Sequence, residues 1–164
     1  MKKTLLLALI SLVFVSIASA QPHIRQRDLY IGARVSEINL SISSGTTFAM
    51  GFEGGFFIAD RVSIGAIFDL KTQSGSAGVT TVKFLGDVGF HFLESKSGAA
   101  FGLFGAGVKS VTHGDTSFLI ELRGGYSLFI TDNIAFEPSI GFEIPFAKGY
   151  DAVFNLGAGF SVYF

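Results

Sequence analysis

The stretch Phe154-Asn-Leu-Gly-Ala-Gly-Phe-Ser-Val-Tyr-Phe164 decides the fold class of this chain. Every second residue is apolar, and the residues between them are small or polar apart from Tyr163. Strict alternation is typical of a β-strand with one apolar face, because successive side chains of a strand point to opposite sides. A terminus that is free in water usually frays. The aromatic final residue, Phe164, therefore indicates that the C-terminus is itself part of a strand.

The start of the chain has the pattern of a secretory signal peptide. A positive start, Met1-Lys-Lys3, precedes an apolar run over residues 5–17, and Ala18-Ser-Ala20 supplies the small residues that a signal peptidase recognises. The apolar run is too short for a membrane-spanning helix. We therefore expect a cleavable signal peptide over residues 1–20 and a single domain over residues 21–164.

The composition excludes several classes of protein. The chain has no Cys, which rules out disulfides and thiolate metal sites. Its net charge is −1, and no basic run follows the signal peptide, so nothing indicates nucleic-acid binding. Charged residues make up only 15%, against about 25% in soluble domains. No later apolar run is long enough for a spanning helix, so a closed β-barrel is the structure in which this apolar chain would cross a membrane.

Alternation continues through the mature chain in eight segments and predicts an all-β, antiparallel, up-and-down barrel. The pattern slips near Glu37, which indicates a β-bulge or the point where the strand leaves the membrane. Gly55-Phe-Phe-Ile-Ala-Asp-Arg-Val62 and Ser127-Leu-Phe-Ile-Thr-Asp-Asn-Ile134 both join an apolar strand end to the next strand through an Asp turn, as hairpins require. The apolar faces before the closing strand are Leu29/Ile31/Ala33/Val35, Phe48/Met50/Phe52/Phe56, Val62/Ile64/Ala66/Phe68/Leu70, Val82/Phe84/Val88/Phe90/Phe92, Phe104/Ala106/Val108, Phe118/Ile120/Leu122/Tyr126/Leu128 and Ile134/Phe136/Ile140/Phe142/Ile144.

The closing strand and the Asp turns resemble those of small bacterial outer-membrane β-barrels, the family that includes the OmpA membrane domain and OmpX. A C-terminal Phe preceded by alternating apolar residues is the hallmark of that family. The resemblance covers essentially the whole mature chain and implies eight transmembrane strands in the outer membrane of a Gram-negative bacterium. It also implies three partners: outer-membrane lipid, lipopolysaccharide, and the barrel-assembly machinery, which would engage the C-terminal strand.

The positions of the charged residues predict which face of the barrel points inwards. No charged residue falls on the apolar register, whereas the opposite register mixes charges of both signs with Gly and Ser. The lumen of an eight-stranded barrel is only wide enough for its own side chains. We therefore expect paired charges to plug the lumen and the apolar register to face lipid. The predicted lumen charge network comprises Arg34, Glu53, Asp69, Lys83, Asp87, Lys109, Glu121, Arg123, Glu137 and Glu143, and Lys71 lies on the same register.

Aromatic residues at strand ends are expected to form girdles at the two membrane interfaces. Pro138 is expected near the periplasmic rim, because it lacks an N–H and a closed barrel has no edge strand to accommodate it. The residues predicted for the girdles are Tyr30, Phe56, Phe92, Phe129, Phe146, Tyr150 and Phe164.

The turn at residues 131–133 sets the pairing of two carboxylates. Counting outwards from it places Glu121 opposite Glu143 on the inner face. Two carboxylates at this distance repel each other unless a cation lies between them. Arg123 lies two residues from Glu121 on the same face, and its planar guanidinium can bridge two acids. We predict a buried triad of Glu121, Arg123 and Glu143. Further candidate partners are Lys83 and Lys109.

The histidines give no indication of a catalytic or metal site. His113 lies beside Asp115 and Ser117, which are the residue types of a hydrolytic triad. Their spacing does not match the His-x-Ser motif of barrel deacylases that act on lipid A. His23 lies in the polar lead-in, and His91 is expected inside the lumen near the periplasmic rim, hydrogen-bonded rather than catalytic. No histidine pair has metal-ligand spacing with a carboxylate, and no cofactor motif is present.

Three functions are compatible with these observations. The leading interpretation is an outer-membrane protein with a plugged, charge-paired lumen that has a structural or surface-interaction role and is not an enzyme. The second is a small porin-like channel, which would favour lumen charges of one sign rather than the near-balance found here. The third is an outer-membrane enzyme that modifies lipid A.

Overall fold

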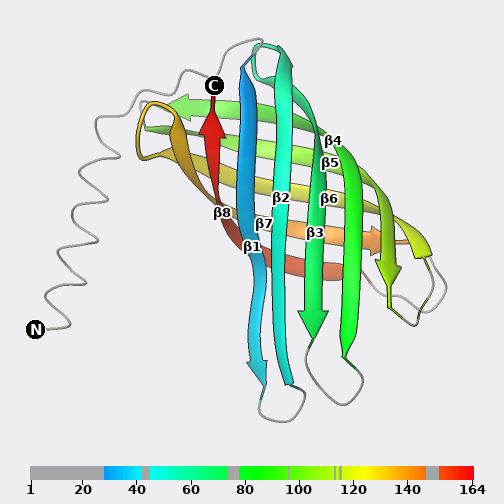
Figure 1. Ribbon diagram of the computed structural model, residues 1–164. Coiled ribbons are helices and arrows are strands. Elements are labelled where there is room, and N and C mark those ends of the chain that lie inside the picture. The colour runs from blue at the N-terminus through cyan, green and yellow to red at the C-terminus, as the bar shows by residue number, and fades with distance from the viewer. Residues whose placement is uncertain are drawn as a thin grey trace, which may run out of the picture.

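The computed structural model describes residues 28–41, 45–73, 78–95, 97–112, 114, 116–146 and 152–164. In this part of the chain, eight strands close into one antiparallel barrel, and each strand pairs with its neighbours in sequence (Figure 1). The predicted all-β, up-and-down fold with eight strands is therefore confirmed. The predicted signal peptide lies outside the described residues and stays a prediction. No helix among the described residues is long and apolar enough to span a membrane. The strands are β1 (Leu29–Ser41), β2 (Gly45–Ala59), β3 (Val62–Gln73), β4 (Val79–Ser95), β5 (Gly98–Val111), β6 (Thr116–Phe129), β7 (Ile134–Pro145) and β8 (Val153–Tyr163).

The two ends of the barrel differ in their connections. The start of β1, the end of β8 and the short connections β2–β3, β4–β5 and β6–β7 lie at one end, here called the turn end. The connections β1–β2, β3–β4, β5–β6 and β7–β8 lie at the other, here called the loop end. The first and last strands close the barrel at the turn end, where Leu29 and Phe164 exchange backbone hydrogen bonds of 3.2 and 2.8 Å.

Alternation along the strands separates an apolar outer face from a polar lumen. Outward side chains are apolar and exposed, such as Phe84 at 54% and Leu156 at 64%. Charged side chains on the opposite register are buried, such as Lys83 at 7% and Glu121 at 3%. A barrel folded for water would show the reverse distribution, whereas a barrel surrounded by lipid shows this one. The structure therefore agrees with the predicted inner and outer faces.

Strand β5 keeps the predicted register although it carries two apolar residues on the wrong face. Phe104 and Val108 are exposed on the outside, as predicted. Phe101 is buried and Leu103 packs against buried apolar residues of the lumen. The inner face of β5 is therefore partly apolar rather than shifted in register.

Two irregularities predicted from the sequence are present in the sheet. The pairing of β1 with β2 shifts between Val35 and Glu37, which confirms the bulge. Pro138 lies in the turn-end half of β7 and pairs with Ala158 of β8. Its pairing with β6 is interrupted between Phe136 and Ser139. Because Pro138 has no N–H, it cannot donate the hydrogen bond that β6 would accept there.

Two residues predicted for the aromatic girdles point into the lumen instead. Tyr30 is 7% exposed and Phe129 is 1% exposed. Both stand on the inner register of their strands, so the alternation that places the charges inside places these rings inside too. Tyr150 lies outside the described residues. The other predicted members are exposed: Phe56, Phe92, Phe146 and Phe164.

Candidate functional site in the barrel lumen

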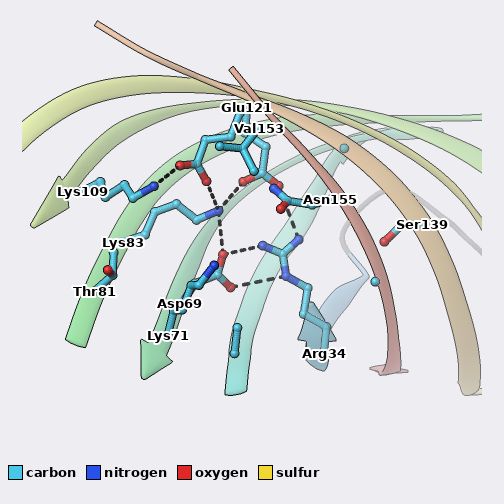
Figure 2. A pocket seen from close by; sticks show the side chains of 14 residues that line it. Arg34, Asp69, Lys71, Thr81, Lys83, Lys109, Glu121, Ser139, Val153 and Asn155 are labelled. Atoms are coloured by element: carbon cyan, nitrogen blue, oxygen red, sulfur yellow. Dashed lines mark hydrogen bonds and ion pairs between the residues drawn. The ribbon is translucent and has the colours of Figure 1, made fainter. Parts of the chain in front are cut away.

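Ion pairs connect several strands in the loop-end half of the lumen, with Lys83 of β4 at their centre (Figure 2). Its Nζ atom lies 2.8 Å from Asp69, 2.6 Å from Glu121 and 3.2 Å from Glu143. An ammonium group has three N–H donors, so these contacts match its full capacity. Lys83 is buried. The three acids therefore depend on protein cations rather than on bulk water for their neutralisation.

Two further cations complete this group. Arg34 of β1 donates from Nε and Nη2 to Asp69 at 3.3 and 2.6 Å, and from Nη1 to Glu121 at 3.4 Å. Lys109 of β5 donates to Glu143 at 2.5 Å. Every oxygen of the three carboxylates consequently contacts at least one cationic nitrogen. We call this group the loop-end cluster. It consists of Arg34, Asp69, Lys83, Lys109, Glu121 and Glu143.

The loop-end cluster lines a cavity of about 100 Å³, here called the mouth cavity. Lys71, Thr81 and Asn155 also line it. These three residues lie in the loop-end parts of β3, β4 and β8, so the cavity occupies the loop-end part of the lumen. Figure 2 shows the side chains of Arg34, Asp69, Lys83 and Lys109 pointing toward one another from several strands. The cavity has room for several water molecules or one small solute.

A second group of charges lies nearer the turn end. Arg123 of β6 forms an ion pair with Glu53 of β2 at 2.5 Å. Glu137 of β7 accepts hydrogen bonds from Ser127 at 2.7 Å, Ser161 at 2.5 Å and Tyr163 at 2.8 Å. Three hydroxyl donors satisfy the carboxylate oxygens of Glu137 although the side chain is buried. Hydrogen bonds from hydroxyl groups thus take the place at Glu137 of the ion pairs found in the loop-end cluster.

Asp87 of β4 belongs to neither group. It is 6% exposed, and neither carboxylate oxygen has a hydrogen-bond partner among the described residues.

Two small cavities of about 20 and 10 Å³ lie beside Glu53, Arg123 and Glu137. Each is about the size of a single water molecule. These two cavities are therefore much smaller than the mouth cavity.

Aromatic side chains gather inside the lumen at the turn end. Tyr30, Phe57, Phe129 and Tyr163 form one buried cluster with Ala135, here called the aromatic plug. Tyr163 lies in its centre, with ring centroids 6.0 Å from Tyr30, 6.4 Å from Phe57 and 5.3 Å from Phe129. These separations are typical of packed aromatic pairs. The aromatic plug is therefore a cluster of packed rings inside the turn end of the barrel.

His91 packs beside the aromatic plug. Its ring centroid lies 5.2 Å from Phe57 and 5.9 Å from Phe101. The predicted position inside the lumen agrees with its 7% exposure. The prediction that it is hydrogen-bonded is wrong for Nδ1, which has no partner among the described residues. Its surroundings are aromatic rings, which supply packing in place of that hydrogen bond.

An inner apolar cluster, which was not predicted from the sequence, separates charged residues along the wall of the lumen. Ile67, Leu85 and Leu119 are fully buried, and Leu103 packs against them. The charge-rich appearance of the inner register concealed these residues. A signal was present, because each of the three buried residues stands directly beside an outward apolar residue, which breaks strict alternation. An apolar pair such as Phe84-Leu85 therefore marks a point where both faces of the strand are apolar.

The predicted triad is only partly formed. Glu121 pairs with Glu143 across β6 and β7, as predicted. The cation that contacts both acids is Lys83, and Arg123 pairs with Glu53 instead. The prediction that Arg123 bridges the two acids is therefore wrong. In a narrow lumen, a side chain from another wall can reach a carboxylate as easily as a diagonal neighbour on the same wall.

The predicted lumen charges all lie on the inner face but do not form one network. Most of them are buried, and the less buried ones, Glu53, Lys71 and Lys109, line cavities of the lumen. The structure divides them between the loop-end cluster and the turn-end pair of Arg123 with Glu53. Glu137 is held by hydroxyl groups, and Asp87 is left apart.

The described residues provide no ligand set for a metal ion. Of the residue types that resemble a hydrolytic triad, His113 and Asp115 lie outside the described residues. Ser117 lies on the inner face of β6 and is buried. The chemistry that the described lumen supports is ion pairing and hydrogen bonding.

Comparison with known proteins places this architecture in a structural class. No protein-family model and no curated protein sequence matches the chain. Neisserial surface protein A has 14% identity and a TM-score of 0.64, with 84% of this chain and 96% of that one covered. The N-terminal β-barrel domain of Pseudomonas aeruginosa OprF has 13% identity and a TM-score of 0.58, with 85% and 98% covered. The outer membrane enzyme PagL has 13% identity and a TM-score of 0.54, with 81% and 98% covered.

The chain has the fold of the eight-stranded outer-membrane β-barrels. The similar structures include an enzyme and a surface protein by their descriptions, so the fold is common to proteins with different roles. Any statement about the role of this chain must therefore come from its own lumen and surface.

Proposed function

We propose that this protein is a non-catalytic β-barrel of the Gram-negative outer membrane with a plugged lumen and a structural or surface-interaction role. The observation that supports this proposal is the burial of charged, apolar and aromatic side chains inside the barrel. The loop-end cluster, the inner apolar cluster and the aromatic plug all lie on the inner face. An eight-stranded barrel has little interior space beyond its own side chains.

The proposed orientation follows from the predicted signal peptide. After export, the N-terminus would enter the membrane from the periplasm, which places the turn end in the periplasm and the loop end outside. The exposed apolar face would contact outer-membrane lipid and lipopolysaccharide. Strand β8, which ends beside the exposed ring of Phe164, would be the segment that the barrel-assembly machinery engages.

The second candidate is a small channel. The mouth cavity favours it, because this cavity is polar and lies at the loop end. The aromatic plug opposes it, because a solute that entered the mouth cavity would meet a packed layer of rings before the turn end. The cavity is therefore better explained as a pocket with one opening than as part of a pore.

Conductance measurements distinguish the plugged barrel from the channel. Purified protein in planar bilayers at low protein load should show no porin-sized current steps, while a porin at the same load serves as the positive control. Reproducible porin-sized steps from this protein would refute the plugged lumen. Mass spectrometry of lipid A from cells with and without the protein tests catalysis separately, and a change in lipid A would refute the non-catalytic role.

A further inference from the structure

We propose that two copies of this protein associate in the membrane through the seam between β1 and β8. The pairing of these two strands ends at Val35 with Ala158, although both strands continue toward the loop end. Figure 1 shows β8 curving away from β1 in that direction. Among the described residues, residues 37–41 of β1 pair only with β2, and residues 153–157 of β8 pair only with β7. We call these segments the β1 edge and the β8 edge.

The backbone of the β8 edge directs hydrogen-bonding groups toward the seam. The N–H of Tyr163 bonds to the residue that precedes β7, and the N–H of Phe164 bonds to the first residue of β1. Successive N–H groups of a strand point to opposite sides, and the pairing of β8 with β7 has no register shift. Phe154 and Leu156 therefore direct their N–H and C=O groups to the same side as Phe164, where the described part of β1 does not pair with them.

The β8 edge lies in the lipid-facing part of the barrel. The side chains of Phe154 and Leu156 are 53% and 64% exposed on its outer face. Strand β8 has 11 residues, a length that spans a bilayer once, so the edge falls in the half of the bilayer nearer the loop end. Backbone groups without partners are strongly unfavourable in hydrocarbon, where no water replaces the missing partner. In the membrane location proposed above, on which this step rests, the edge therefore requires another strand.

A second copy supplies strands for both edges at once. Strands β1 and β8 are antiparallel within one copy. A two-fold axis parallel to the barrel axis keeps the direction of every strand, so the β8 edge of one copy runs antiparallel to the β1 edge of the other. The same axis makes the two contacts identical, and one dimer closes all four edges. A single foreign strand inserted into the seam would be antiparallel to only one of its two neighbours.

An open groove beside the β8 edge leaves room for a second barrel. It has a volume of about 480 Å³, and its lining includes Gly124, Pro138, Ile140 and Leu156, which lie on the outer register. The small residues lower the surface there relative to the exposed Phe side chains elsewhere on the outer face. Because Leu156 also belongs to the β8 edge, the groove is continuous with the proposed contact between the two copies.

Cysteine cross-linking tests this contact, because the natural chain has no Cys. The bulge adds one residue to β1 after Val35, so continuing the register beyond Val35 and Ala158 sets Asn39 opposite Asn155. Copies carrying Asn39→Cys are mixed with copies carrying Asn155→Cys in lipid vesicles at a low protein-to-lipid ratio. Oxidation of this mixture should produce a disulfide-linked dimer.

Phe68→Cys mixed with Leu122→Cys is the matched control, because both positions are exposed on the outer face of strands away from the seam. This mixture should show only background cross-linking. Equal cross-linking in the two mixtures would overturn the proposal. A disulfide within a single chain of the double variant Asn39→Cys, Asn155→Cys would overturn it as well, because the seam would then close inside one copy.

A pair of variants at Leu156 tests the backbone contact itself. Leu156→Pro and Leu156→Ala both shorten the side chain, but only Leu156→Pro removes the N–H that points to the seam. That N–H points away from β7, so the pairing of β8 with β7 is retained. Leu156→Pro should raise the dissociation constant of the dimer about thirtyfold relative to Leu156→Ala, because the dimer loses one hydrogen bond at each of its two contacts.

Energy transfer between differently labelled copies in vesicles measures this dissociation constant. Gel mobility of unheated samples establishes that each variant is folded. Equal dissociation constants for folded Leu156→Pro and Leu156→Ala would overturn the proposed contact. Flotation of the protein with the vesicles tests the membrane location separately, so a failure of the dimer is distinguishable from a failure of the proposed function.

Discussion

Replacing Lys83 by Met tests whether the loop-end cluster stabilises the barrel. Lys83 contacts three carboxylates at 2.6 to 3.2 Å and is 7% exposed. Removing one partner of a buried ion pair costs about 3–5 kcal/mol, because an uncompensated charge remains. Asp69 and Glu121 still contact Arg34, and Glu143 still contacts Lys109. We therefore expect the lower end of that range, a loss of about 3 kcal/mol.

The measurement is equilibrium urea unfolding in lipid vesicles, followed by circular dichroism, because the chain contains no Trp. Arg61→Met is the matched control, since the side chains of Arg61 and its partner Glu94 are 52% and 33% exposed. An exposed pair of this kind contributes about 0–1 kcal/mol.

The double variant Lys83→Met, Glu121→Gln removes one cation together with one carboxylate and leaves the Arg34–Asp69 and Lys109–Glu143 pairs in place. It should recover much of the lost stability, because each remaining charge of the cluster keeps a counterion. A double variant no more stable than Lys83→Met alone would show that these residues do not act as one network. Equal losses in Lys83→Met and Arg61→Met would refute the reasoning about burial.

Two further predictions concern the outer face and the turn end. Ile120→Arg, on the outer face of β6, should lower the free energy of unfolding by about 2–4 kcal/mol in lipid. Thr81→Arg, in the mouth cavity, should lower it less. The reverse order would mean that the faces are assigned incorrectly. Phe57→Ala should cost about 3–5 kcal/mol because it leaves a cavity in the aromatic plug. A loss below about 1 kcal/mol in urea unfolding would mean that the plug is loosely packed.

The sequence was sufficient for the contacts that depend on neighbouring strands. Alternation separates the faces, and the tight turn after Phe129 fixes the register that sets Glu121 beside Glu143. It was insufficient for contacts across the lumen, because strand order does not say which side chains meet through the interior. Lys83 and Arg34 reach Glu121 from strands that are not adjacent to β6 in the barrel. Those contacts depend on the tilt and stagger of the strands.

The errors at the turn end have a different cause. Tyr30 and Phe129 were assigned to the membrane interfaces because they are aromatic and lie at strand ends. Their register places them inside, where they form the aromatic plug with Phe57 and Tyr163. Whether a residue falls on the inner or the outer register of its strand was therefore a better guide to its position than its residue type.

The closure of the barrel has a consequence for the order of folding. Every other pairing joins strands that are consecutive in the sequence, so each can form as a local hairpin soon after its two strands are available. The pairing of β1 with β8 joins opposite ends of the described chain. Its loop-closure entropy is the largest of the eight pairings, and it cannot begin until the last strand has been synthesised. The rate-limiting step of folding is then expected to be the docking of β8 onto β1, so substitutions within β8 should slow folding more than substitutions within the central hairpins.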